Sequence, residues 1–156
     1  MYVLCVTKSG NLQRLKKFLV LEQMKDFDGK VTAVVGAPDK QFDRTEGNLR
    51  VVSHLNAKEL QLEIAAAKLI VSRSGYSTIM DLASMGKKAV FVPTPGQTEQ
   101  EYLAKLFEDR KEHMALSQRK FDLPSAIKKS EEYSGFQPRK FDAFKPAVDA
   151  FITSLS

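Results

Sequence analysis

The stretch Leu69–Asp81, LIVSRSGYSTIMD, has the residue types and spacing of a phosphate-binding turn. It predicts a short buried strand that stops at Ser74-Gly75 and leads into a helix. Such a turn frees backbone N–H groups, and the positive end of the helix dipole points at the ligand. Ser77 and Thr78 would assist with their hydroxyls, and Asp81 would accept hydrogen bonds from ribose hydroxyls. These residues therefore indicate a nucleotide-type ligand.

The same residues also fit an interpretation that needs no ligand. Thr78 and Asp81 have the S/T-x-x-D spacing of a capping box, which only closes the first turn of a helix. Tyr76 is interpreted either as a stacking or lid residue or as a packed aromatic. Arg73 is expected to pair with a carboxylate, in the plainest case as a surface ion pair.

A second strand-to-helix turn, Thr7-Lys8-Ser9-Gly10, could cradle a phosphate, with Lys8 supplying positive charge. Its candidate binding residues are Ser9 and Gly10. The turn has one glycine and matches neither GxGxxG nor GxxxxGK followed by Ser or Thr. The sequence therefore predicts neither a GxGxxG dinucleotide site nor a P-loop.

A third polar loop runs through Gly96 into a helix. Gln97, Glu99 and Gln100 could hydrogen-bond the hydroxyls of a sugar. The alternative is again a capping box, here between Thr98 and Glu101, because acidic residues suit the first turn of a helix.

The elements that would position these loops alternate along the chain. Apolar, β-branched runs predict strands, and apolar residues at helical spacing predict helices. The polar segment 38–48 is expected to be a loop. The predicted strands are 2–7, 31–35, 49–53, 69–72, 89–92 and 113–116, and the predicted helices are 11–25, 57–67, 78–85, 99–111, 121–132 and 141–155.

Near-continuous apolar strands separated by helices predict an α/β fold, a Rossmann-like doubly wound parallel sheet with helices on both faces. In such folds ligands bind at the carboxyl ends of the strands. All three candidate loops follow predicted strands, so we expect them at that edge.

Composition limits the function. The 156 residues fit one domain, and no apolar run approaches the roughly 20 residues of a membrane span. The net charge of +5 suits an anionic ligand or an anionic membrane face, but no basic stripe interleaved with aromatics indicates nucleic acid. The single Cys5 excludes an internal disulfide and is consistent with a cytoplasmic location. His54 and His113 lack neighbours at metal-ligand spacing, and no nucleophile–base pair stands out.

Several motifs in order resemble a known family. They are Ser72-Arg73-Ser74-Gly75, Thr78 with an acid at Asp81, Gly86, Val92-Pro93, and a helix start centred on Gln100. Over about residues 49–107 the chain resembles the donor-binding, C-terminal half of a GT-B glycosyltransferase. The family is glycosyltransferase family 28, the MurG-like enzymes, which use UDP-N-acetylglucosamine.

The resemblance implies roles for the candidate residues. Ser74 and Gly75 would meet the donor diphosphate, and Asp81 would bind the ribose. Gln100 and Glu101 would stand near the donor sugar. The segment 53–56 falls near the uracil-contacting loop, so Leu55 and Asn56 join the candidate site.

The chain departs from the family at three of its positions. The family usually has Glu at Asp81, Gln at Glu101 and Asn at Ala104. By the resemblance the reaction would be inverting and independent of any metal or cofactor other than the UDP-sugar donor.

The resemblance also implies a partner. GT-B enzymes have two Rossmann-like domains, and this chain has room for a single GT-B half-domain over residues 1–156. We expect an N-terminal acceptor domain, or a separate acceptor-binding subunit as in the similar eukaryotic Alg13–Alg14 pair. No residue here is an obvious general base. A lipid-linked acceptor would suit the basic charge and a peripheral contact on the inner membrane face. The alternatives are a nucleotide-binding regulatory module without catalysis, and half of a UDP-sugar 2-epimerase-type enzyme.

Overall fold

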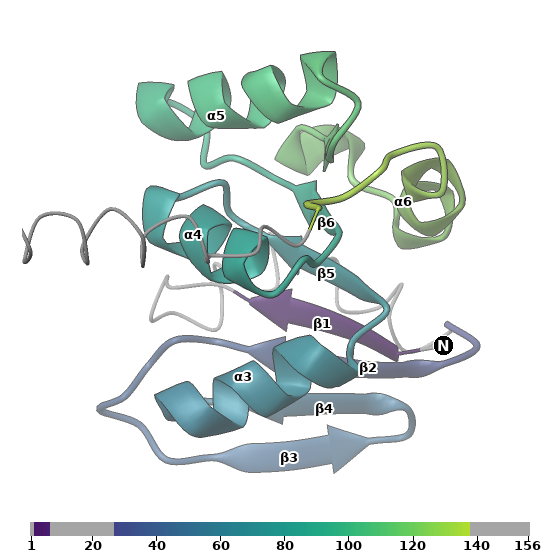
Figure 1. Ribbon diagram of the computed structural model, residues 1–156. Helices are drawn as coiled ribbons and strands as arrows, with labels where there is room; N and C mark the ends of the chain where they lie inside the picture. The colour runs from purple at the N-terminus through teal and green to yellow at the C-terminus, as the bar shows by residue number, and fades with distance from the viewer. Residues whose placement is uncertain (1, 7–26, 138–156) are drawn as a thin grey trace, which may run out of the picture.

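A seven-stranded sheet forms the centre of the protein (Figure 1). The computed structural model describes residues 2–6 and 27–137. The sheet order is β3-β4-β2-β1-β5-β6-β7. The strands are β1 (Tyr2–Val6), β2 (Lys30–Val34), β3 (Asp43–Glu46), β4 (Leu49–Val52), β5 (Leu69–Ser72), β6 (Ala89–Phe91) and β7 (Met114–Ala115).

Every neighbouring pair in the sheet is parallel except β3 with β4. With the edge strand β3 set aside, the six parallel strands have the order 3-2-1-4-5-6 of a doubly wound Rossmann sheet. The predicted fold class is therefore confirmed, with a mostly parallel sheet.

Helices cover both faces of this sheet. They are α3 (Ala57–Ala66), α4 (Tyr76–Ser84), α5 (Thr98–Asp109) and α6 (Leu123–Ser130), with a short 3-10 helix η1 (Gln118–Lys120). On one face α3, α4 and α5 pack apolar side chains against the sheet, and on the other face α6 does so. In Figure 1, α3 lies along the β2–β4 part of the sheet and α4 lies beside β5.

The central strands have nearly continuous apolar sequences because both of their faces are buried. In β1, Val3 and Cys5 enter the core on the α6 side, while Leu4 between them enters the core on the α3 side. This alternation is the period of two that a strand imposes on its side chains. Burial of Cys5 raises the pKa of its thiol far above the ordinary value.

One element contradicts the sequence prediction. Residues Asp43–Glu46, DRTE, form β3 although segment 38–48 was expected to be a loop. All four side chains are exposed, so no apolar alternation marks the strand. It is held as an antiparallel edge by the turn at Gly47, whose φ is +60°, and by Arg50, whose Nη2 lies 2.6 Å from Asp43 Oδ2.

The described helices α3 to α6 agree with the predicted ones to within a few residues at each end. Asp122 caps α6, because its carboxylate accepts from Ser125 N at 2.9 Å. The predicted helices 11–25 and 141–155 and the turn at Lys8–Gly10 lie outside the described residues. Within the described part of the chain no helix is long and apolar enough to cross a membrane.

Candidate functional site

The candidate site lies where the direction of the sheet reverses. β1 and β5 are neighbours, with Val6 opposite Ser72 at their carboxyl ends. The chain continues from β1 to β2 on one side and from β5 to β6 on the other. This is the topological switch point, where open α/β sheets bind ligands. The loop Arg73–Gly75 leaves β5 here; Ser9 and Gly10, which follow β1, lie outside the described residues.

Helix α4 begins directly at this point, with Gly75 as its N-cap. Thr78 is the third residue of the helix, so the capping box predicted between Thr78 and Asp81 is wrong. The helix starts two residues earlier because Gly75 has extended backbone angles, φ −77° and ψ 146°, and Tyr76 takes the first helical position. Thr78 is half-buried, whereas Ser77 is exposed.

Among the described residues, no side-chain cap hydrogen bond is made at the N-cap of α4, which is Gly75. The helices α3 and α6 differ from it in this respect. Asn56 and Glu59 form a full capping box on α3, and Asp122 caps α6. At α4 the N-cap position is a glycine, so the first turn of this helix has no capping side chain from its own N-cap residue at the edge where a ligand would bind.

The surroundings of Gly75 are open. A Cβ atom built at this position would meet nothing within 4 Å. Tyr76 is 65% exposed, so the packed-aromatic interpretation of that residue is wrong, and the stacking or lid interpretation stays a prediction. Asp81, one turn further along α4, is exposed. Within the described chain its carboxylate has no hydrogen-bond partner, so it is available to a ligand.

Ser74 has a different environment. It is fully buried, and its hydroxyl donates to the carbonyl oxygen of Gln100 at 2.6 Å. The bond joins the β5–α4 loop to the start of α5. The hydroxyl is thus engaged and the whole residue is buried, so the contact of Ser74 with a diphosphate stays a prediction.

The loop between β6 and α5 is held by the side chains that sequence reasoning assigned to a sugar. Gln100 Oε1 accepts from Thr94 N at 2.9 Å, and Gln100 Nε2 donates to the side chain of Gln97. Glu101 Oε1 accepts from Gly96 N at 3.0 Å. Glu99 is exposed beside them in the first turn of α5.

The capping box predicted between Thr98 and Glu101 is wrong. Gln97 is the N-cap of α5, and no side chain caps the helix. Glu101 instead reaches back to Gly96, whose φ of +82° is a conformation that glycine adopts without strain. The polar spacing was read correctly as a helix start, but the partner of Glu101 depends on how the loop turns.

Arg73 connects the loops at this edge. Its Nη1 donates to the carbonyl oxygens of Val92 at 2.8 Å and Pro93 at 2.9 Å, and its Nη2 donates to Gln118 Oε1 at 3.1 Å. Burial lowers the pKa of Arg73 to about 10, because a charged group is less stable away from water. The expected carboxylate pairing is thus replaced, in these contacts, by carbonyl and amide oxygens. Sequence reasoning missed this role, since the acceptors lie 19 to 45 residues away.

The candidate residues Leu55 and Asn56 follow β4, on the far side of β2 from the switch point. Leu55 is 9% exposed and packs in the core under α3. Asn56 is engaged as the N-cap, accepting from Glu59 N at 2.9 Å. The structure therefore brings residues 73–81 and 96–101 together, and places this pair further along the same edge.

One polar group at the switch point has no partner. Ser72 is fully buried at the end of β5, and its hydroxyl makes no hydrogen bond among the described residues. In the same part of the chain no three His, Cys, Asp or Glu side chains gather as a metal-binding group.

The doubly wound sheet matches the Rossmann-like C-terminal half of GT-B glycosyltransferases. The model of the glycosyltransferase family 28 C-terminal domain matches residues 5–148, and the chain belongs to that family. The resemblance inferred from the motifs around Ser74 and Gln100 is confirmed.

Curated relatives support this assignment. The chain is 32% identical over 91 residues to the UDP-N-acetylglucosamine–N-acetylmuramyl-(pentapeptide) pyrophosphoryl-undecaprenol N-acetylglucosamine transferase of Rhodopseudomonas palustris (strain ATCC BAA-98 / CGA009). That match covers 58% of this chain and 22% of the relative. The enzyme of the same name from Methylobacterium radiotolerans is 47% identical over 47 residues, which are 30% of this chain and 13% of that protein.

Solved structures share the fold. MurG from Acinetobacter baumannii superposes with a TM-score of 0.59 at 18% identity, covering 82% of this chain and 41% of that one. The glycotransferase of kitacinnamycin superposes with a TM-score of 0.63 at 14% identity, covering 84% and 36%. The chain thus matches well under half the length of these proteins.

Proposed function

We propose that this chain is the donor-binding domain of a hexosyltransferase and binds a UDP-sugar similar to UDP-N-acetylglucosamine. The observation that carries the proposal is the glycine at the N-cap of α4 at the switch point, with open space around Gly75 among the described residues. Membership of family 28 and the activity that the names of the relatives describe support the choice of donor.

The diphosphate would lie against the first turn of α4. Backbone N–H groups there and the positive end of the helix dipole would bind it without any charged side chain. Asp81 would accept hydrogen bonds from the ribose, and Tyr76 would stack on or cover the ligand. The side chains around Gln97 to Glu101 would stand beside the sugar.

In this proposal the chain contributes to transfer by stabilising the leaving diphosphate. Negative charge grows on the leaving oxygens as the glycosidic bond breaks, and fixed N–H dipoles stabilise it more in the transition state than in the ground state. The reaction would be inverting and would need no metal, as the family resemblance implies. The general base would come from an N-terminal acceptor domain or a separate acceptor-binding subunit.

The acceptor is proposed from the relatives. Their printed name describes transfer to a pyrophosphoryl-undecaprenol lipid. A lipid-linked acceptor would place this protein in the cytoplasm at the inner membrane face. The net charge of +5 would favour such a peripheral contact.

A calorimetric titration with UDP, UDP-N-acetylglucosamine, GDP and dTDP tests the proposal. Saturable binding of UDP and its sugar, with little binding of GDP or dTDP, is the expected result. Absence of binding to every nucleotide would overturn the donor role. Turnover of the UDP-sugar without acceptor would instead support an epimerase-type activity. Binding without transfer in the presence of an acceptor half would support a regulatory module.

A further inference from the structure

Arg73 occupies a position from which one side chain reaches three loops of the carboxyl edge. The residue itself belongs to the β5–α4 loop, two residues before the N-terminus of α4. Its guanidinium donates to Val92 and Pro93 in the β6–α5 loop, and to Gln118 in η1 after β7.

The geometry of these bonds suits arginine alone. The planar guanidinium presents several N–H groups in a fixed fork, so it can hold two neighbouring carbonyl oxygens and a third acceptor in one orientation. A lysine also has three N–H donors, but they share one nitrogen on a flexible stem and do not hold the acceptors in one fixed orientation. Half-burial limits competition by water, so the bonds keep the two loops at a fixed separation.

The anchored segment leads directly into the loop proposed to face the sugar. Val92 and Pro93 precede Thr94, whose N–H is held by Gln100. Ser74, the neighbour of Arg73, adds a second connection, because its hydroxyl donates a hydrogen bond to the carbonyl oxygen of Gln100. The position of the β6–α5 loop relative to α4 is therefore set from residues 73 and 74.

We infer that Arg73 is a positioning residue that couples the diphosphate-binding turn to the sugar-binding loop. It acts through Val92 and Pro93, and determines how much affinity the sugar adds to that of the bare nucleotide. The N-terminus of α4, which would hold the diphosphate, does not depend on it. This inference rests on the proposed donor-binding function.

The test compares the affinity of the full chain for UDP and for UDP-N-acetylglucosamine, in the wild type and in Arg73→Met and Arg73→Lys. We expect Arg73→Met to keep the affinity for UDP within about threefold while losing most of the gain that the sugar provides. Arg73→Lys is expected to lose most of that gain as well, because one ammonium cannot replace the fork.

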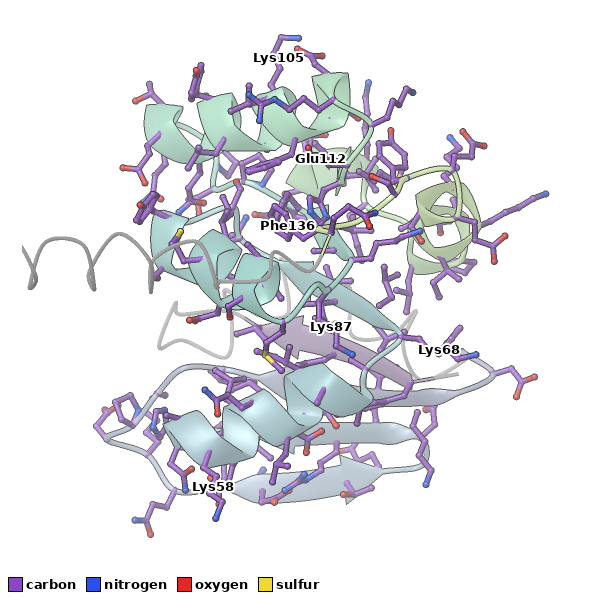
Figure 2. The ribbon with its side chains drawn as sticks, in the orientation of Figure 1. Lys58, Lys68, Lys87, Lys105, Glu112 and Phe136 are labelled. Atoms are coloured by element: carbon purple, nitrogen blue, oxygen red, sulfur yellow. The ribbon has the colours of Figure 1, made fainter. Side chains whose placement is uncertain are left out.

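Lys87 offers a matched control. Its ammonium, labelled in Figure 2, donates to the carbonyl oxygens of Ala65 at 2.5 Å and Ala67 at 3.3 Å. It lies just before β6, at the amino-terminal edge of the sheet and so away from the candidate site. Like Arg73→Met, Lys87→Met removes hydrogen bonds from a basic side chain to carbonyl oxygens. It should lower the denaturation midpoint without changing the ratio of the two dissociation constants.

The outcomes separate this inference from the donor-binding proposal. If wild type binds both ligands and Arg73→Met keeps the full gain from the sugar, the inference is wrong and the donor role stands. An equal loss of UDP and UDP-sugar binding in Arg73→Met, matched by Lys87→Met, would show a merely structural role. Wild-type affinities that are equal for the two ligands would also overturn the inference, since there would be no sugar contribution to position. Failure of wild type to bind either ligand would overturn the donor role and this inference together.

Discussion

The hydroxyl of Ser74 donates to the carbonyl oxygen of Gln100 at 2.6 Å, joining the turn before α4 to the first turn of α5. Both residues were singled out from sequence as ligand contacts. The structure shows them bonded to each other, with Ser74 fully buried. The Ser74 hydroxyl therefore links two loops of the fold.

Ser74→Ala should therefore reduce stability more than binding. Loss of one hydrogen bond is expected to lower the free energy of unfolding by about 0.5–1.5 kcal/mol. Denaturant unfolding and a UDP titration measure the two effects. A folded variant that is as stable as wild type but no longer binds UDP would show that the hydroxyl contacts the diphosphate.

Gly75→Asp should block the site without harming the fold. Aspartate is a favourable N-cap, its charge suits the helix dipole, and the space at Cβ is open, so stability should hold or rise by a few tenths of a kcal/mol, roughly. Its carboxylate would take the N–H groups of α4 and repel a diphosphate. We expect UDP affinity to fall at least about tenfold.

Gly75→Asn is the matched control for that charge. It caps the helix with the same shape but carries no negative charge, so it should weaken UDP binding less than Gly75→Asp. Full-strength UDP binding by a folded Gly75→Asp variant would place the diphosphate elsewhere.

Asp81→Ala distinguishes a ribose contact from a helix cap. The carboxylate is exposed within α4 and the capping box is absent, so stability should change by no more than about 0.5 kcal/mol. UDP binding should weaken by about 1–3 kcal/mol through the unpaired ribose hydroxyls. The control is Asp109→Ala, at the C-terminal end of α5, which should leave UDP binding unchanged. Equal effects of the two substitutions would argue against a ribose contact.

The free energy of unfolding should decrease as the pH is lowered, because of the titration of His113. Its Nδ1 accepts from Ala89 N at 3.1 Å, and its ring packs among Phe91, Phe107 and Phe136. Burial lowers its pKa from 6.5 to about 4. The unfolded chain therefore binds a proton between these values while the folded chain does not. The stabilisation by neutral His113 is complete above pH 6.5, and roughly 3 kcal/mol of the free energy of unfolding is lost as the pH falls to 4.

Urea unfolding across this pH range measures that loss. His113→Asn keeps an acceptor near Ala89 and removes the titration, so its stability should be lower at neutral pH but flatter between pH 6.5 and 4. The pKa values of Asp43 and Asp122 lie below 3.8, because Arg50 and Ser125 respectively hydrogen-bond their carboxylates, so their contributions are lost only at lower pH. An unchanged slope in His113→Asn would contradict the assignment.

A comparison of Ser72 with Ser53 tests whether the hydroxyl of Ser72 lacks a hydrogen-bond partner. Both are buried, but Ser53 Oγ accepts from Phe42 N at 3.2 Å whereas Ser72 Oγ has no partner in the described residues. Ser72→Ala should raise the free energy of unfolding by about 1 kcal/mol, since an unpaired buried hydroxyl is removed. Ser53→Ala should lower it by a similar amount. A destabilised Ser72→Ala would show that the hydroxyl is paired in solution.

Much of the fold was accessible from the pattern of apolar residues. β1, β5 and β6 are buried on both faces, so their runs of valine, leucine and isoleucine mark them directly. β3 carries no such mark, because all of its side chains face solvent and its position depends on pairing with β4. Helix starts were displaced by two residues at α4, where backbone angles at Gly75 rather than a side chain define the cap.

The sequence by itself determined the alternation of strands and helices, the family, and the loops that carry the candidate residues, because these follow from local pattern and motif order. Only the tertiary structure decided which side chains are free to act. Gln100 and Glu101 hold their own loop, Ser74 holds Gln100, and Arg73 holds Val92, Pro93 and Gln118. Those partners are set by the order of β5, β6 and β7 in the sheet. The physical reason is that a hydrogen bond depends on distance in space, which residue spacing fixes within one helix or turn but not between loops.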